Sequence, residues 1–205
     1  MYLIYDLAHV FFAVSFRPIF GYRVIGSGNV PKEGPVILAS NHASYMDPPF
    51  VGTGIWRRVN FVARDTLFDR PWKRFILNSW RAMPVRREQL DKSVLKAILG
   101  RLKEGKVVGL FPEGTRSEDG ELQPAKAGIG MIVSMADVPV VPVYIKGSHK
   151  TMSKRESKLR AVPISIVYGK PMRFPKVPGE PGHDRYQRIA DEIMAAIAEL
   201  KREHG

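Results

Sequence analysis

The sequence predicts a layered α/β domain, in which a largely parallel or mixed central sheet is flanked by helices. Short runs rich in valine and isoleucine alternate along the chain with longer segments of helical periodicity, the order that parallel sheets require. The length of 205 residues suits a single domain with a sizeable core. The composition is 44% hydrophobic and 25% charged, which excludes a disordered polymer and a collagen-like repeat.

The first expected element is a short, strongly apolar helix within residues 1–20. Leu7, Val10 and Val14 recur at helical spacing, and Pro18 predicts that the helix stops near that position. The apolar stretch is too short for a membrane span, which needs about 20 residues. A helix that packs on the core and a helix that lies in a membrane interface remain open as alternatives.

The remaining residues, 21–205, are expected to form one domain. The predicted strands share short length, β-branched residues and flanking glycine or proline, and they cover 22–26, 36–39, 60–63, 107–111, 138–145 and 163–168. The predicted helices share an apolar stripe, and they run from an N-cap at Asp91 to about Gly105, over 126–136, and from about Tyr186 to Leu200. The last helix is expected to pack on the core because its polar face mixes both signs of charge.

The chain is strongly basic, with 32 Lys and Arg against 20 Asp and Glu and a formal net charge of +12. Most of the surplus falls in residues 51–110, where tryptophan and phenylalanine alternate with the cations. Nucleic acids and anionic membranes both bind surfaces of this kind, so charge alone does not identify the partner. The absence of cysteine excludes disulfides, thiolate nucleophiles and cysteine-ligated metals.

A histidine and an aspartate follow directly after the predicted strand at 36–39. On one helix, His42 and Asp47 would face different sides, so a direct contact between them needs a turn. Asp47 followed by Pro48 supplies that turn as a predicted N-cap and first helical residue. The carboxylate then keeps one imidazole nitrogen protonated and leaves the other as a general base for a substrate hydroxyl. Taken alone, the pair is also compatible with a structural histidine.

A second polar motif, Phe-Pro-Glu-Gly-Thr-Arg-Ser, occupies residues 111–117 and ends another predicted strand. The turn exposes backbone N–H groups, Thr115 adds a hydroxyl donor, and Arg116 is able to bind a phosphate through two hydrogen bonds. The motif therefore predicts an anion site, with an ordinary polar turn as the alternative.

Taken together, the two motifs resemble those of the glycerolipid acyltransferases, above all the bacterial 1-acyl-glycerol-3-phosphate acyltransferases. The resemblance extends over roughly residues 22–168. Residues 83–87 resemble the second block of the family, where Arg87 falls on the substrate-binding arginine, and residues 138–143 resemble the fourth. Arg64 stands where the family commonly has a lysine, which keeps the positive charge.

The resemblance implies transfer of a fatty acyl group from acyl-CoA or an acyl carrier protein to the free hydroxyl of 1-acyl-glycerol-3-phosphate (lysophosphatidate), giving phosphatidic acid for phospholipid synthesis. His42 would act as the base and Asp47 would orient it, with no metal and no resident cofactor. The residues that the resemblance assigns to substrate binding are Arg64, Arg87, Glu113, Gly114, Thr115 and Arg116.

The expected partners are lysophosphatidate, the acyl thioester, an anionic membrane surface and, where it is the donor, acyl carrier protein; nucleic acid is not expected. Without a secretory signal or a spanning segment, we expect peripheral or monotopic attachment to the cytoplasmic face of the cell membrane. Three alternatives remain: another lysophospholipid or glycerol-3-phosphate as acceptor, a non-enzymatic binder of membranes or nucleic acid, and a metal-dependent hydrolase. The third has the thinnest ligand set, because no second histidine lies near His42.

Overall fold

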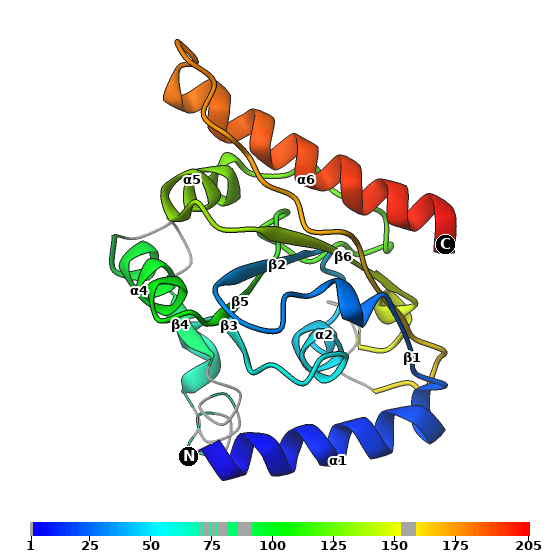
Figure 1. Ribbon diagram of the computed structural model, residues 1–205. Helices are drawn as coiled ribbons and strands as arrows, with labels where there is room; N and C mark the ends of the chain where they lie inside the picture. The colour runs from blue at the N-terminus through cyan, green and yellow to red at the C-terminus, as the bar shows by residue number, and fades with distance from the viewer. Residues whose placement is uncertain are drawn as a thin grey trace.

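The computed structural model describes residues 2–69, 71, 74, 77, 82–85, 92–152 and 159–205. Within them, seven strands form one sheet in the order β1-β7-β6-β2-β5-β3-β4 (Figure 1). Every neighbouring pair is parallel except β6 and β7, which are antiparallel. The strands are β1 (Arg23–Ile25), β2 (Val36–Ser40), β3 (Val59–Arg64), β4 (Met83–Val85), β5 (Val107–Leu110), β6 (Val140–Lys146) and β7 (Ser165–Tyr168). The mixed, layered α/β fold expected from the sequence is confirmed.

Helices cover both faces of this sheet, as Figure 1 shows. The α-helices are α1 (Tyr2–Phe20), α2 (Asp47–Thr53), α4 (Lys92–Lys103), α5 (Ala127–Ala136) and α6 (Gly182–His204), and the short 3-10 helices are η1 (Ser27–Asn29), η2 (Asp65–Phe68) and η3 (Ser148–Lys150). Strand β2 is buried on both sides, because Ile37 and Ala39 pack under α4, α5 and α6 while Val36 and Leu38 pack under α1 and α2. The near-continuous apolar run of this strand follows from that double burial.

Two predicted features of the elements, and one strand that was not predicted, need correction or comment. Helix α1 continues through Pro18 to Phe20 instead of stopping near the proline. Pro18 lacks the N–H that would donate within the last turn, but Phe16 and Phe20 gain ring contacts with Phe50 of α2 at 4.8 and 5.3 Å, which hold this turn on the core. The edge strand β4 contains Pro84, which edge strands tolerate. The predicted N-cap Asp91 lies outside the described residues.

The apolar stripe of α6 packs on the core as expected, with Ile189, Ile193 and Ile197 fully buried. None of the helices in the described residues is long and apolar enough to cross a membrane.

The topology places the two polar motifs side by side. Strands β2 and β5 are parallel neighbours in the middle of the sheet, so their carboxyl ends lie at the same edge. Strand β6 pairs with the other side of β2 in the same direction and also ends there. Functional sites of α/β proteins gather at this edge of the sheet.

Candidate active site

The two motifs are joined by hydrogen bonds between their loops, although 71 residues separate them in the chain. The backbone N–H of His42 donates to Glu113 Oε1 at 3.1 Å. The backbone N–H of Ser117 donates to the carbonyl oxygen of His42 at 2.8 Å. The loops after β2 and β5 therefore form one rigid surface, with the histidine held at its centre.

His42 and Asp47 are in direct contact, with Nδ1 and Oδ2 2.8 Å apart. Oδ2 also accepts hydrogen bonds from the backbone N–H groups of Ala43 and Ser44 at 2.7 and 2.8 Å. Helix α2 begins at Asp47 itself, with Met46 in the N-cap position, so the predicted N-cap role of Asp47 is wrong. Its carboxylate serves the preceding loop instead of the helix, and this fold-back produces the predicted contact with the imidazole.

The environment of His42 leaves one ring nitrogen free for chemistry. An ionised aspartate only accepts hydrogen bonds, so Nδ1 carries the proton and Nε2 is the basic nitrogen. The ring stacks on Phe111 with centroids 3.9 Å apart and planes 16° from parallel, which fixes its orientation. The side chain is 18% exposed while Asp47 is fully buried. A substrate can thus reach the imidazole but not the carboxylate.

Glu113 is a buried carboxyl group beside this pair, with 2% of its surface exposed. Burial raises its pKa from 4.5 to about 7, and the negative charge of Asp47 acts in the same direction. The backbone N–H groups of His42 and Gln123 lower the pKa and offset part of the effect. The carboxyl group therefore keeps its proton to a higher pH than an exposed glutamate does, and it lies beside the histidine loop.

The turn that follows Glu113 presents the other candidate binding residues. Gly114 has a positive φ of 66° and is exposed, as is Thr115. The guanidinium carbon of Arg116 lies 3.6 Å from the ring centroid of Tyr45, which belongs to the histidine loop. Nη1 of Arg116 is buried and has no hydrogen-bond partner among the described residues. The arginine is thus held against the first motif with hydrogen-bonding capacity to spare.

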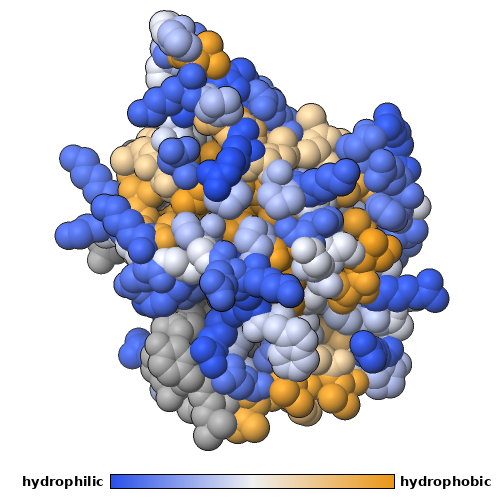
Figure 2. Space-filling view, in the orientation of Figure 1, coloured by the Kyte–Doolittle hydropathy of each residue, from blue (hydrophilic) through white to orange (hydrophobic). Residues whose placement is uncertain are grey.

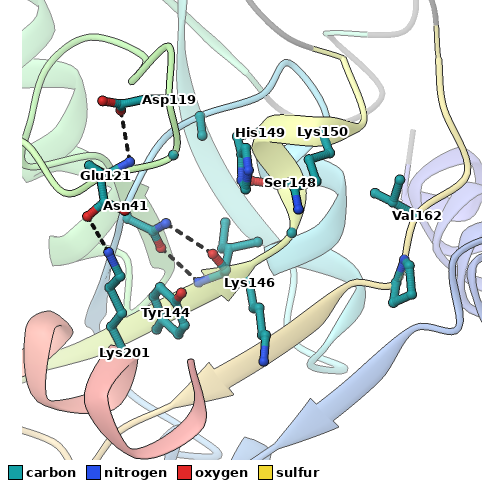
Figure 3. A pocket seen from close by; sticks show the side chains of 15 residues that line it. Asn41, Asp119, Glu121, Tyr144, Lys146, Ser148, His149, Lys150, Val162 and Lys201 are labelled. Carbon is teal, nitrogen blue, oxygen red and sulfur yellow. Dashed lines mark hydrogen bonds and ion pairs between the residues drawn. The ribbon is translucent and has the colours of Figure 1, made fainter.

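Asn41 precedes the histidine and anchors the loop to the third strand of the site. Its side-chain Nδ2 donates to the carbonyl oxygen of Ile145 at 3.1 Å, and its Oδ1 accepts from the N–H of Ile145 at 2.7 Å. The side-chain amide thereby continues the β2–β6 ladder beyond the end of the backbone pairing (Figure 3). Its contribution is to position the loop.

A pocket of about 400 Å³ borders the loop on the β6 side (Figure 3). Asn41 and Ala43, which flank the histidine, form part of its wall, together with the end of β6, η3 and the last turn of α6. Lys201 of this wall is paired with Glu121 at 2.6 Å. The pocket adjoins the site but contributes no side chain to the His–Asp pair.

Two predicted binding residues are not placed by these contacts. Arg64 ends β3, next to β5 and at the same edge of the sheet as the motifs, but its side chain is not among those described. Arg87 lies outside the described residues. Two residues that contact the turn, Tyr45 and Lys126, were not predicted from the sequence. For Tyr45 the one available signal was an aromatic residue within the His42 motif, and for Lys126 there was none.

Comparison with known proteins identifies the class of protein to which the chain belongs. Residues 21–146, more than half of the chain, match the family model described as Acyltransferase. The chain therefore belongs to the acyltransferase family and is an acyltransferase, as the two motifs predicted.

Particular relatives carry a more specific name. The 1-acyl-sn-glycerol-3-phosphate acyltransferase of Bacillus subtilis is 30% identical over 185 residues, which are 88% of each chain. The chloroplastic 1-acyl-sn-glycerol-3-phosphate acyltransferase BAT2 of Brassica napus is 29% identical over 94% of this chain, which spans only 54% of that relative. The crystal structure of the 1-acyl-sn-glycerophosphate acyltransferase PlsC from Thermotoga maritima superposes with a TM-score of 0.78 and 25% identity, over 96% of this chain and 79% of the other.

Proposed function

We propose that the protein transfers a fatty acyl group from a thioester to the free hydroxyl of 1-acyl-glycerol-3-phosphate, giving phosphatidic acid for phospholipid synthesis. The observation that supports this most strongly is the His42–Asp47 pair hydrogen-bonded to the turn that carries Arg116. A base for a hydroxyl and a cation for a phosphate thus lie on one surface. The names of the relatives supply the acceptor, because they act on 1-acyl-glycerol-3-phosphate by their titles.

The reaction proceeds in one transfer. Nε2 of His42 removes the proton of the acceptor hydroxyl, whose oxygen attacks the thioester carbonyl carbon. The carbon–oxygen bond forms, the carbon–sulfur bond breaks, and the proton on Nε2 passes to the departing thiolate. Asp47 stabilises the imidazolium between these two proton transfers, since its charge is fixed 2.8 Å from Nδ1.

The phosphate of the acceptor is held by the turn after β5. Arg116 supplies a delocalised charge whose planar donors match phosphate oxygens, and the exposed Thr115 adds a neutral hydroxyl donor. The N–H of Gly114 donates to the carbonyl oxygen of Phe111 at 3.0 Å, so Gly114 contributes the exposed bend of the turn. Glu113 shapes the floor of the acceptor pocket. Arg64 and Arg87 belong to the same phosphate site in this proposal. Because these contacts fix the hydroxyl near His42, their loss lowers the rate as well as the affinity.

Residues 1–20 are proposed to dock the enzyme on an anionic membrane surface at the cytoplasmic face of the cell membrane. One face of α1 packs on the core, whereas Leu7, Phe11 and Val14 on the other face are 61%, 64% and 67% exposed. Apolar side chains gather along this edge of the molecule in Figure 2. Trp56 is 83% exposed, and its ring lies against that of His9 of α1, with centroids 5.1 Å apart and planes tilted by 36°, so it adds an exposed aromatic side chain beside this helix. An exposed stripe of this kind suits the headgroup boundary of a bilayer.

Thiol release from acyl-CoA and from acyl carrier protein, followed by mass spectrometry of the product, tests the proposal. The acceptors are lysophosphatidate, lysophosphatidylglycerol and glycerol-3-phosphate in mixed micelles. We expect phosphatidic acid from lysophosphatidate with at least one donor. Acylation of only another acceptor would reassign the substrate, and release of thiol without an acylated product would contradict acyl transfer to a lipid.

A further inference from the structure

Lys126 lies directly before α5, and its side chain crosses the turn that contains Gly114. Its backbone N–H donates to the carbonyl oxygen of Pro112 at 3.0 Å, which ties the start of the helix to the turn. A Cβ added to Gly114 would lie 3.0 Å from Cδ and 3.3 Å from Nζ of Lys126. The glycine therefore leaves space that the lysine chain occupies, and the ammonium lies against the candidate phosphate site.

The ammonium of Lys126 has no carboxylate partner where the structure is described, because none of the ion pairs there includes it. Glu113, the acid of the same turn, directs Oε1 to the backbone of His42 instead. A cation at the amino end of α5 is opposed by the helix dipole. The first turn of α5 contains no acidic residue that would offset this repulsion. The charge of Lys126 therefore adds no ion pair and no favourable dipole interaction to the stability of the described fold.

The same turn carries a second cation, Arg116, two residues after Gly114. Arg116 is stacked on Tyr45, and its Nη1 has no partner among the described residues. Gly114, with its positive φ, is exposed between Glu113 and Thr115, so the turn offers room for an anion beside Lys126.

We infer that Lys126 is a further phosphate-binding residue of the acceptor site, and that its charge, added to those of the arginines proposed there, favours a phosphomonoester headgroup over a phosphodiester. The inference rests on the proposed function and specifies its substrate class. A phosphomonoester carries between one and two negative charges at neutral pH, with a second pKa near 6, whereas a phosphodiester carries one. An additional cation in the site therefore stabilises the bound phosphomonoester more than the bound phosphodiester.

The test is steady-state kinetics of Lys126→Gln and Lys126→Arg with lysophosphatidate and lysophosphatidylglycerol, at saturating thioester in detergent micelles. Loss of one charged hydrogen bond at an exposed site predicts a KM for lysophosphatidate raised about tenfold in Lys126→Gln, with kcat changed less than about threefold. In Lys126→Gln the ratio of kcat/KM for lysophosphatidate to kcat/KM for lysophosphatidylglycerol falls by a similar factor, and Lys126→Arg restores most of this ratio. Lys103→Gln is the matched control, because this exposed lysine ends α4 before the amino end of β5, at the opposite edge of the sheet.

Each other outcome counts against the inference. An active wild type with an unchanged KM and an unchanged monoester preference in Lys126→Gln would overturn it and leave the proposed function standing. A lowered melting temperature with an unchanged KM would show that the side chain only packs on the turn. A wild type that acylates no phosphate-bearing acceptor would overturn the proposed function and this inference together.

Discussion

Glu113 should make the stability of this protein depend on pH, and Glu113→Gln should remove that dependence. Burial raises the pKa of this carboxyl group to about 7 in the folded state, against an ordinary value of 4.5. The folded protein therefore binds the proton more tightly than the unfolded chain does. The stabilisation from this proton is complete below about pH 4.5 and is lost as the pH rises through about 7.

The size of the effect follows from the shift. One pKa unit corresponds to about 1.4 kcal/mol, so the full shift corresponds to about 3 kcal/mol of unfolding free energy. Glutamine has nearly the shape of the protonated carboxyl group but does not titrate. The free energy of unfolding of the wild type should therefore fall by about 3 kcal/mol relative to Glu113→Gln between pH 4.5 and 8, because the other titrating groups cancel in the difference.

Urea unfolding of both proteins at several pH values in this range measures that difference directly. Glu203→Gln on α6 is a suitable control, because Glu203 is exposed and its removal should leave the pH dependence unchanged. Stability curves of wild type and Glu113→Gln that run parallel over the whole range would refute the assigned pKa and its cause.

Two further substitutions test the site and the membrane face. Asp47→Asn should lower kcat by about 10³- to 10⁴-fold, because the imidazolium loses its counter-charge, and it should reduce stability by about 1–3 kcal/mol because the new amide N–H₂ finds no acceptor at the buried position of Oδ1. Turnover within tenfold of wild type would remove Asp47 from the proposed mechanism. Leu7→Glu combined with Val14→Glu should abolish sedimentation with anionic vesicles but preserve turnover of micellar substrate, since both side chains are more than 60% exposed and do not support the core. Undiminished vesicle binding would contradict docking through α1.

The meeting of the two motifs could be predicted from the sequence because it depends on simple rules. Each motif ends a short run of β-branched residues, and parallel strands of an α/β sheet end at one edge. The remaining contacts depend on which strands are neighbours. The N–H of His42 reaches Glu113 only because β2 and β5 pair in this register. The order of strands in a sheet cannot be predicted from the periodicity of a single segment.

Local rules also failed where tertiary contacts outweighed them. Asp47 before Pro48 has the pattern of an N-cap, but three donors of the preceding loop hold its carboxylate, and the helix starts one residue earlier than the pattern predicts. Lys126 belongs to no motif, and its position is shown by the backbone hydrogen bond to Pro112 and by the close approach of its side chain to Gly114. Lys126 violates the rule that helices do not begin with a cation, and it lies at the candidate site.

The central claim is that His42 is the base of acyl transfer, and His42→Gln tests it most directly. The measurement is the yield of phosphatidic acid from lysophosphatidate and the active thioester, determined by mass spectrometry alongside the far-UV circular dichroism spectrum. His183→Gln serves as control, because this side chain is 86% exposed on α6. If His42 is the base, the folded His42→Gln protein forms almost no phosphatidic acid while the control matches wild type. Wild-type yield from His42→Gln would contradict this role.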